Sequence, residues 1–310
     1  MRGEQMKYHK ITTFSRRAII IGVAPAILLY LVLGVGPSLA TFIFSFTDIS
    51  GLKGAPWHWV GLANYKEYFM TQNYRDYLDV IKRTLIYALA TTVIQNVIAL
   101  FVALLLNSKD IRGRNFHRAV IFMPVVLGVM VTAISWTLFF NSVDGPAAAF
   151  LALFGKYSNF FGDQKLAFVL CIAAQIWMYM GYSMVIFLAG LQTIPQGLYE
   201  AAKIDGSNAW SQFRYVTFPL LWPSITVNGL MSIIGSLSSF QIILLTTGGN
   251  FNTTTLSMTA YANAFGLGKI ASITGLRQGY AAAINMILFT IILVFVLIFQ
   301  AYMKKKEDVQ

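Results

Sequence analysis

Polar and aromatic side chains recur at helical spacing in two long apolar stretches of this sequence. In the stretch 166–191 they fall at i, i+3, i+4 and i+7 and so share one helical face, formed by Gln175, Met178, Tyr179 and Tyr182. In the stretch 223–246 a second face carries Asn228, Ser232, Ser236 and Ser239, with Gly235 beside them. Amides, hydroxyls and aromatic rings can hold a neutral sugar without any charged group. The two faces are therefore suited to line a path for a neutral solute, although the same residue types also pack membrane helices together.

Catalytic and metal-binding patterns are missing from the sequence. It contains no Gly-x-x-x-x-Gly-Lys-Ser/Thr phosphate loop, no His-Glu-x-x-His and no Gly-x-Ser-x-Gly. His9, His58 and His117 all lie in tails or loops. Cys171 is the only cysteine, so an internal disulfide and a multi-cysteine metal site are both impossible. We therefore expect no catalytic residue and no metal site on this chain, and any ATP must be hydrolysed by a partner.

The loop between the two stretches, 192–222, has the composition of a short helix. Pro195 precedes a segment rich in helix formers, and Gly206 follows that segment as a natural helix terminator. These signals predict a helix of about two to three turns. A second amphipathic segment, 210–218, then leads to Pro219 and the next apolar stretch.

Six apolar stretches are long enough to hold these residues in a membrane, because about 20 apolar residues cross the hydrocarbon. They are 18–46, 84–106, 119–140, 166–191, 223–246 and 280–302, and none contains Asp, Glu, Lys, Arg or His. Continuous apolar runs favour helices over the alternating strands of a barrel. The first stretch is too long for the core of a cleaved signal peptide, so we expect it to be retained. The sequence thus predicts an all-α integral membrane protein with six transmembrane helices.

The basic residues indicate how these helices are oriented. Lys and Arg outnumber Asp and Glu by 23 to 12, giving a net charge of +11, but they flank the apolar stretches and so argue against nucleic-acid binding. Segments 1–17, 107–118, 192–222 and 303–310 hold 14 of the 23. The positive-inside rule places these segments, and both termini, in the cytoplasm. Lys82 and Arg83 oppose this bias, and we expect their side chains to reach the outer headgroups.

The inner loop resembles the EAA loop of binding-protein-dependent ABC importer permeases. That motif reads Glu-Ala-Ala, three residues, Gly, nine residues, then apolar-x-apolar-Pro. The matching residues here are Glu200, Ala201, Ala202, Gly206 and Pro219, while Val216 and Phe218 replace the usual Ile and Leu. The string from Tyr199 to Gly206 is similar to the carbohydrate branch in particular. Segments 59–65, 103–107 and 246–249 extend the resemblance over nearly the whole chain.

This resemblance implies a type I ABC importer permease fold, with a permease domain at 18–302 between cytoplasmic tails at 1–17 and 303–310. It implies that the short helix docks on an ATPase through Tyr199, Glu200, Ala201, Ala202, Asp205, Gly206 and Pro219. The implied partners are a homologous second permease, two copies of an ABC ATPase that bind ATP and Mg, and an extracytoplasmic sugar-binding protein. No cofactor would be bound by this chain. The implied location is the bilayer of a bacterial or archaeal inner membrane.

Three alternatives remain open on the residues alone. The chain could be a uniporter or channel that works without ATP, or a membrane-embedded transferase. The short helix could also lie at the membrane interface without a partner. The lack of charged residues in the spans counts against an ion-coupled carrier, because such carriers usually need ionisable groups in mid-membrane. Copurification of an ATPase would separate the importer from the uniporter and the transferase.

Overall fold

The computed structural model describes residues 16–70, 74–108, 111–266 and 276–307. In this part of the chain the regular structure is helical, apart from one antiparallel bridge between Thr47 and Trp59. The predicted all-α class is thereby confirmed. Most of the two predicted tails, residues 1–15 and 308–310, lies outside the described residues, as does Lys109.

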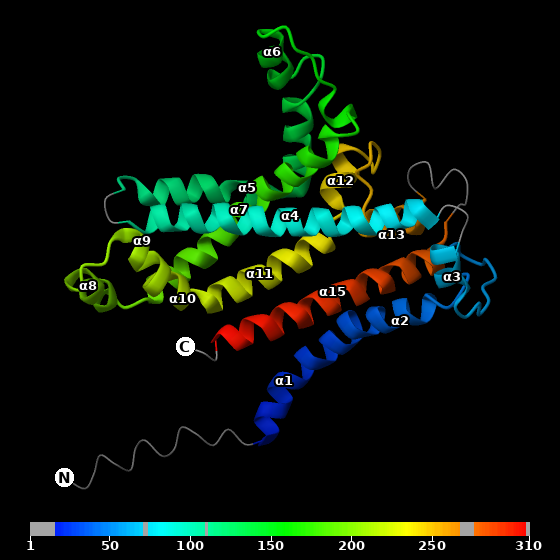
Figure 1. The fold of residues 1–310 in the computed structure, drawn as a ribbon. Coiled ribbons are helices and arrows are strands. Elements are labelled where there is room, and N and C mark those ends of the chain that lie inside the picture. The colour runs from blue at the N-terminus through cyan, green and yellow to red at the C-terminus, as the bar shows by residue number, and fades with distance from the viewer. Residues whose placement is uncertain (1–15, 71–73, 109–110, 267–275, 308–310) are drawn as a thin grey trace.

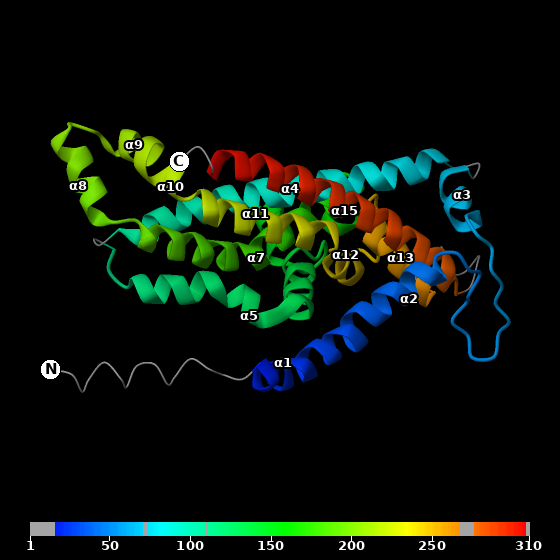
Figure 2. The same cartoon turned by 90° about the horizontal axis from the view of Figure 1, so that it is seen from below.

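Four long helices form the body of the molecule. They are α4 (Tyr74–Asn107), α7 (Leu166–Thr193), α11 (Trp222–Leu237) and α15 (Gln278–Glu307). Helix α4 packs against α7 and α11, and α11 packs against α15 (Figures 1 and 2). The first span is made of α1 (Arg16–Tyr30), the π-helical turn η2 (Leu31–Val35) and α2 (Gly36–Phe44). Only the α2 end of this span lies along α15, and α1 extends away from the bundle (Figure 2).

Five helices are long and apolar enough to cross a membrane, namely Gly22–Phe44, Leu78–Asn107, Arg114–Phe139, Leu166–Thr193 and Gln278–Lys305. They correspond to the first, second, third, fourth and sixth predicted spans. A sixth candidate is the pair Ala209–Leu220 and Trp222–Leu237, which is bent by 67°. The described residues therefore contain five or six candidate spans, in agreement with the predicted number.

The predicted fifth span, 223–246, is wrong as one continuous helix. Helix α11 ends at Leu237, residues 238–240 are not helical, and α12 (Gln241–Thr246) begins after them. Tertiary hydrogen bonds hold this break. The Ser239 hydroxyl donates to Gln175 Oε1 at 3.2 Å, and the Ser257 hydroxyl donates to the Ser238 carbonyl at 2.8 Å. Serine side chains compete with helical hydrogen bonding, so a serine pair is a suitable place for a break.

Helix α5 (Arg114–Phe139) is also interrupted. Gly128 has φ +78° and ψ 168°, a conformation that is open essentially only to glycine. Pro124, one turn earlier, lacks the N–H needed for a helical hydrogen bond. The first half of α5 runs beside α7, and the second half turns away toward α6 (Pro146–Ala152) (Figure 1). The third predicted span is thus helical on both sides of a sharp change in direction.

Short helices lie at the end of the bundle where α4 and α15 begin (Figure 1). Helix α3 (Ala63–Met70) is tied to the start of α15 because Glu67 accepts two hydrogen bonds from Arg277, at 2.5 and 2.7 Å. Helix α13 (Leu256–Phe265) packs on α15. Arg83 donates to the carbonyl of Thr254 at 3.2 Å, so its side chain contacts the loop that precedes α13. The sequence analysis had predicted that this side chain would reach the lipid headgroups.

The inner loop contains the predicted short helix, α8 (Gln196–Ile204), followed by α9 (Ala209–Gln212), the π-helical turn η4 (Phe213–Thr217) and α10 (Phe218–Leu220). Gly206 has φ +78°, which confirms that it ends α8 in a left-handed conformation. Figure 1 shows α8 at the opposite end of the bundle from α3.

Candidate functional site

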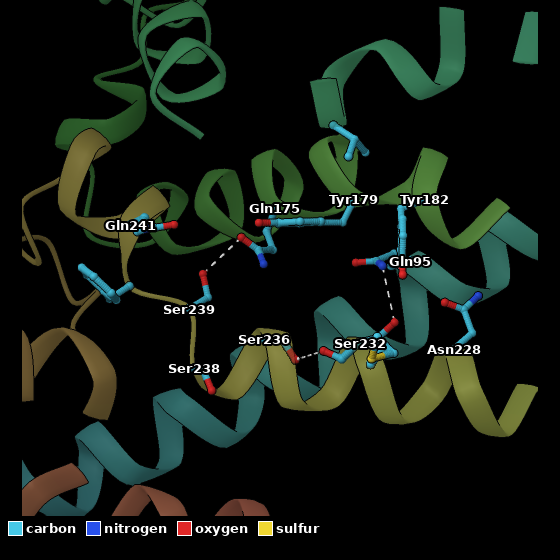
Figure 3. A pocket seen from close by; sticks show the side chains of 14 residues that line it. Gln95, Gln175, Tyr179, Tyr182, Asn228, Ser232, Ser236, Ser238, Ser239 and Gln241 are labelled. Carbon is cyan, nitrogen blue, oxygen red and sulfur yellow. Dashed lines mark hydrogen bonds between the residues drawn. The ribbon is translucent and has the colours of Figure 1, made fainter. Parts of the chain in front are cut away.

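A central cavity of about 510 Å³ lies between α4, α5, α7 and α11 and reaches the break before α12 (Figure 3). It contains seven of the eight residues predicted to line a path: Gln175, Tyr179, Tyr182, Asn228, Ser232, Ser236 and Ser239. Met178 is not among the lining residues. Its side chain is buried in an apolar cluster with Ile242 and Ile243, because its position falls at the edge of the helical face that the two tyrosines share.

Helix α7 supplies the amide and aromatic wall of the central cavity. Gln175 is buried and accepts a hydrogen bond from Ser239, which lies in the break after α11. Tyr182 is 40% exposed and lies about two turns after Gln175 on the same face. Figure 3 shows that the side chains of Tyr179 and Tyr182 project from α7 into the space between α7 and α11. This wall presents an amide and two aromatic rings to whatever occupies the cavity.

Helix α11 supplies the hydroxyl wall. Ser232 and Ser236 lie one turn apart, and the Ser236 hydroxyl donates to the Ser232 carbonyl at 2.7 Å. Asn228 is fully buried and donates to the carbonyl of Ser183 at 3.1 Å, whereas its Oδ1 has no hydrogen-bond partner among the described residues. An unpaired buried acceptor costs about 1–3 kcal/mol, so this position favours a donor such as water or a ligand hydroxyl.

Helix α4 contributes two amides that the sequence interpretation missed. The Gln95 side chain lines the cavity and donates to the hydroxyls of Ser183 at 2.7 Å and Ser232 at 3.4 Å. Asn96 donates to the same Ser232 hydroxyl at 3.0 Å. Two adjacent amides in an otherwise apolar stretch are a signal that the sequence does contain. Gln241 and Phe240, which also line the cavity, were missed because the predicted fifth span ran through them.

The central cavity is neutral and is only partly enclosed by this chain. No Asp, Glu, Lys, Arg or His occurs among the described residues that line it. Several lining residues are exposed, including Met231 at 54%, Ser238 and Gln241. Exposed serine and glutamine side chains are poorly solvated by hydrocarbon.

The candidate coupling helix α8 has one anchored side and one open side. Tyr199 packs beside the apolar cluster formed by α4 and α7, and its hydroxyl lies 3.0 Å from that of the buried Thr217 in η4. Glu200, Ala201 and Asp205 are exposed, and Ala202 is half-buried. The open side thus offers the small Ala201 beside the Glu200 and Asp205 carboxylates, with Ala202 at its edge, and another protein can pack closely on this surface.

The end of α8 is set by paired backbone hydrogen bonds. The N–H of Ser207 donates to the carbonyl of Ala202 at 2.9 Å, and the N–H of Gly206 donates to that of Lys203 at 3.1 Å. This is the Schellman arrangement, which needs a residue with positive φ at the position of Gly206. Pro219 lies at the start of α10, just before the 67° bend into α11. The seven predicted coupling residues therefore occupy one continuous helix–turn–helix segment.

The chain matches the family described as binding-protein-dependent transport system inner membrane components over residues 95–308, more than two thirds of its length. It is 32% identical to the probable starch degradation products transport system permease protein AmyD of Thermoanaerobacterium thermosulfurigenes, covering 93% of this chain and 94% of that one. It is 30% identical to the trehalose/maltose transport system permease protein MalF of Thermococcus litoralis, covering 92% and 93%.

Solved structures with the same fold come from a bacterial ABC transporter that imports the acidic polysaccharide alginate. One chain superposes with a TM-score of 0.76 at 20% identity and covers 93% of this chain and 95% of its own length. A chain from the complex with an alginate-bound periplasmic protein gives 0.77 at 19% identity, covering 93% and 94%. At this level of identity the likeness concerns the fold.

Proposed function

The chain belongs to the family of binding-protein-dependent transport system inner membrane components, and on that premise we propose that it forms one half of the path for a neutral sugar or oligosaccharide in an ATP-driven importer. Membership makes it a multi-pass inner-membrane transport component and not an enzyme. The observation that carries the proposal is the central cavity, whose lining combines amides, hydroxyls and aromatic rings without a charged side chain.

The chemistry of the lining favours neutral sugars over acidic ones. Sugar hydroxyls both donate and accept hydrogen bonds, and Gln95, Gln175 and Ser232 can do the same. An acidic sugar would bring its carboxylate into a cavity with no cation to pair with it, at a large cost in desolvation. The names of the relatives point to the same class, since they refer to starch degradation products, to trehalose and maltose, and to multiple sugars.

A homologous second permease completes the path in this proposal. The exposed Ser238 and Gln241 at the cavity opening support it, because their polar side chains need a protein surface in place of lipid. An extracytoplasmic binding protein delivers the sugar at the end of the bundle opposite α8. Both termini and the inner loop then face the cytoplasm, in keeping with the distribution of basic residues.

The segment from Tyr199 to Pro219 docks on an ABC ATPase, which is present in two copies in the transporter and binds ATP and Mg; this chain binds no cofactor. The exposed face of α8 supports this role, since Ala201 and Ala202 permit close contact and Glu200 can pair with a cation. The 67° bend joins the loop to α11, so a displacement of α8 is passed to the helix that carries Asn228 and the serines.

The test is uptake in cells that produce the intact transporter. Tyr182→Ala and Ser236→Leu should each lower uptake of a neutral oligosaccharide by about tenfold, since each removes or blocks contacts worth about 1.4 kcal/mol. Tyr302→Ala is the matched control, because Tyr302 is exposed on α15 away from the cavity. An ATPase should copurify with all of these variants.

Two results would contradict the proposal. If both cavity variants take up the oligosaccharide at the wild-type rate, the sugar path does not run through this cavity. Uptake that continues after ATP depletion, with no ATPase copurifying, would favour a uniporter or channel.

A further inference from the structure

An apolar groove lies at the end of the bundle that carries α8, between α4 and the segment formed by α9 and η4 (Figure 1). This α4–α9 groove has a volume of about 500 Å³. One wall consists of Val97, Leu100, Phe101 and Leu104 of α4, and the other includes Trp210 and Phe213. None of the described residues that line the groove is charged.

The α4–α9 groove faces away from the central cavity. With about 3.6 residues per turn, its four residues of α4 fall on the side of that helix opposite Gln95, which lines the cavity. They also continue a stripe of exposed apolar residues, because Val93 precedes Val97 by one turn and Phe101 follows it by one turn. Helix α4 is a candidate membrane span, so the groove is continuous with a surface that hydrocarbon can cover.

The depth of the groove corresponds to one leaflet of the bilayer. Val97 lies ten residues before Asn107, the last residue of α4, and Leu104 lies three residues before it. These separations correspond to about 15 and 5 Å along the helix, and the hydrocarbon of one leaflet is about 15 Å thick. The opposite wall is also apolar enough for the membrane, since Ala209–Leu220 and Trp222–Leu237 together qualify as a bent span. An acyl chain therefore suits the groove in length and polarity.

Residues beside the groove suit a phospholipid head group. Trp210 and Tyr215 are exposed, and such amphipathic rings favour the boundary between hydrocarbon and head groups. Arg214 follows the groove-lining Phe213, is exposed, and forms no ion pair within the described part of the chain. A guanidinium group can bind a phosphate through two parallel hydrogen bonds. An anionic phospholipid thus matches both the apolar groove and the charge next to it.

The groove also borders the segment around α8. Tyr199 of α8 and Thr217 of η4 both line it, and their hydroxyls lie 3.0 Å apart. A molecule in the groove therefore contacts α4 and α8 at the same time. Its presence would help to hold α8 in place relative to α4.

We propose that the α4–α9 groove binds an anionic phospholipid, whose acyl chain lies along α4 and whose phosphate pairs with Arg214. The inference rests on the proposed function only for the sidedness of the chain, which makes this a lipid of the inner leaflet. It is independent of the sugar path, because the groove and the central cavity lie on opposite faces of α4.

The test is photo-crosslinking of the full chain, in the complex that copurifies with it, in lipid nanodiscs. The probe is phosphatidylglycerol with a diazirine near the middle of one acyl chain, in a bilayer of phosphatidylcholine, and labelled residues are identified by mass spectrometry. We expect labelling at 97–104 and 209–217. Val97→Trp, which fills the groove from an exposed position, should reduce this labelling by about fivefold. Val93→Trp, one turn earlier on the same stripe, is the matched control and should leave labelling within about twofold of wild type.

Arg214→Gln tests the charge separately, and it changes only an exposed side chain. Unlabelled phosphatidylglycerol should compete with the probe better than phosphatidylcholine does in the wild type. This preference should fall by about fivefold in Arg214→Gln, the effect of one arginine near anionic lipid. Arg112→Gln makes the same change at another exposed arginine and should keep the preference.

Each outcome decides the proposal. Labelling that falls in Val97→Trp alone, with the anionic preference lost in Arg214→Gln alone, supports the site. Equal labelling in the two tryptophan variants overturns it, because the lipid would then only coat the stripe. An unchanged preference in Arg214→Gln overturns the phosphate contact. A wild-type groove that stays unlabelled while Val93 is labelled also overturns the site and indicates a protein segment as the occupant. Both leaflets of the nanodisc carry the probe, so none of these outcomes depends on sidedness, which reporter fusions test separately.

Discussion

Gln95 is the residue that joins three walls of the central cavity. Its amide donates from α4 to Ser183 on α7 and to Ser232 on α11, and it is itself buried. Removing the amide would leave the hydroxyl of the fully buried Ser183 without this donor, at a cost of about 1–3 kcal/mol. The residue therefore serves both the chemistry of the lining and the spacing of the helices around it.

We predict that Gln95→Leu lowers both uptake and stability. Uptake of a neutral oligosaccharide should fall by about tenfold, and the thermal unfolding midpoint in detergent by a few degrees. Gln300→Leu makes the same chemical change at an exposed position on α15 and should alter neither property. A Gln95→Leu protein with normal uptake would show that the amide only packs helices.

The residues of the cavity were only partly predictable from sequence. Periodicity on a single helix identified Tyr179, Tyr182 and the serines of α11, since these share helical faces. It did not identify Gln95, because only the fourth and fifth stretches were searched for a polar face, although Gln95 follows Thr91 by one turn in α4. It also included Met178, which is apolar and fits the neighbouring core better than a polar wall.

At the scale of elements, α8 and its terminating turn are the part whose sequence and structure agree most closely. Gly206 has positive φ, and an added Cβ would meet no atom within 4 Å. A substitution there is therefore strained by its backbone and not by crowding. Gly197 provides the contrast, since it lies inside α8 with equally open space and ordinary helical geometry.

We predict that Gly206→Ala weakens the turn by about 1 kcal/mol, whereas Gly197→Ala does not, because alanine favours a helix interior. Gly206→Val, and to a lesser degree Glu200→Lys, should reduce copurification of the ATPase and abolish hydrolysis stimulated by loaded binding protein. All variants should still insert into the membrane. If loaded binding protein stimulates ATP hydrolysis fully in Gly206→Val, this turn has no role in coupling.

The breaks in α5 and after α11 show that hydropathy does not predict whether a membrane helix is continuous. A run of apolar residues indicates that a segment lies in the membrane, but it says little about whether the helix is continuous. Continuity depends on Gly128 and on hydrogen bonds from Ser239 and Ser257 to partners distant in sequence. Those partners are known only once the helices are packed, so tertiary contacts decided what the sequence pattern could not.

At the scale of the whole molecule, sidedness stays a prediction. A reporter fused after Gln310, or one inserted at Arg112 beside Lys109, should be cytoplasmic, because both sites lie in basic segments. A reporter inserted after Lys53, in the loop between α2 and α3, should be accessible from outside and serves as the control. Labelling of either of the first two in intact cells would reverse the orientation.

The neutral lining of the central cavity has an electrical consequence. Moving one elementary charge across the membrane costs or yields about 2.3 kcal/mol per 100 mV. A neutral sugar carries no current when it passes the described lining residues, because none of them is charged. Import by this route should then proceed at the same rate in polarised vesicles and in vesicles clamped at zero potential. The direction of transport would be set by ATP alone, independently of the ion gradients of the cell.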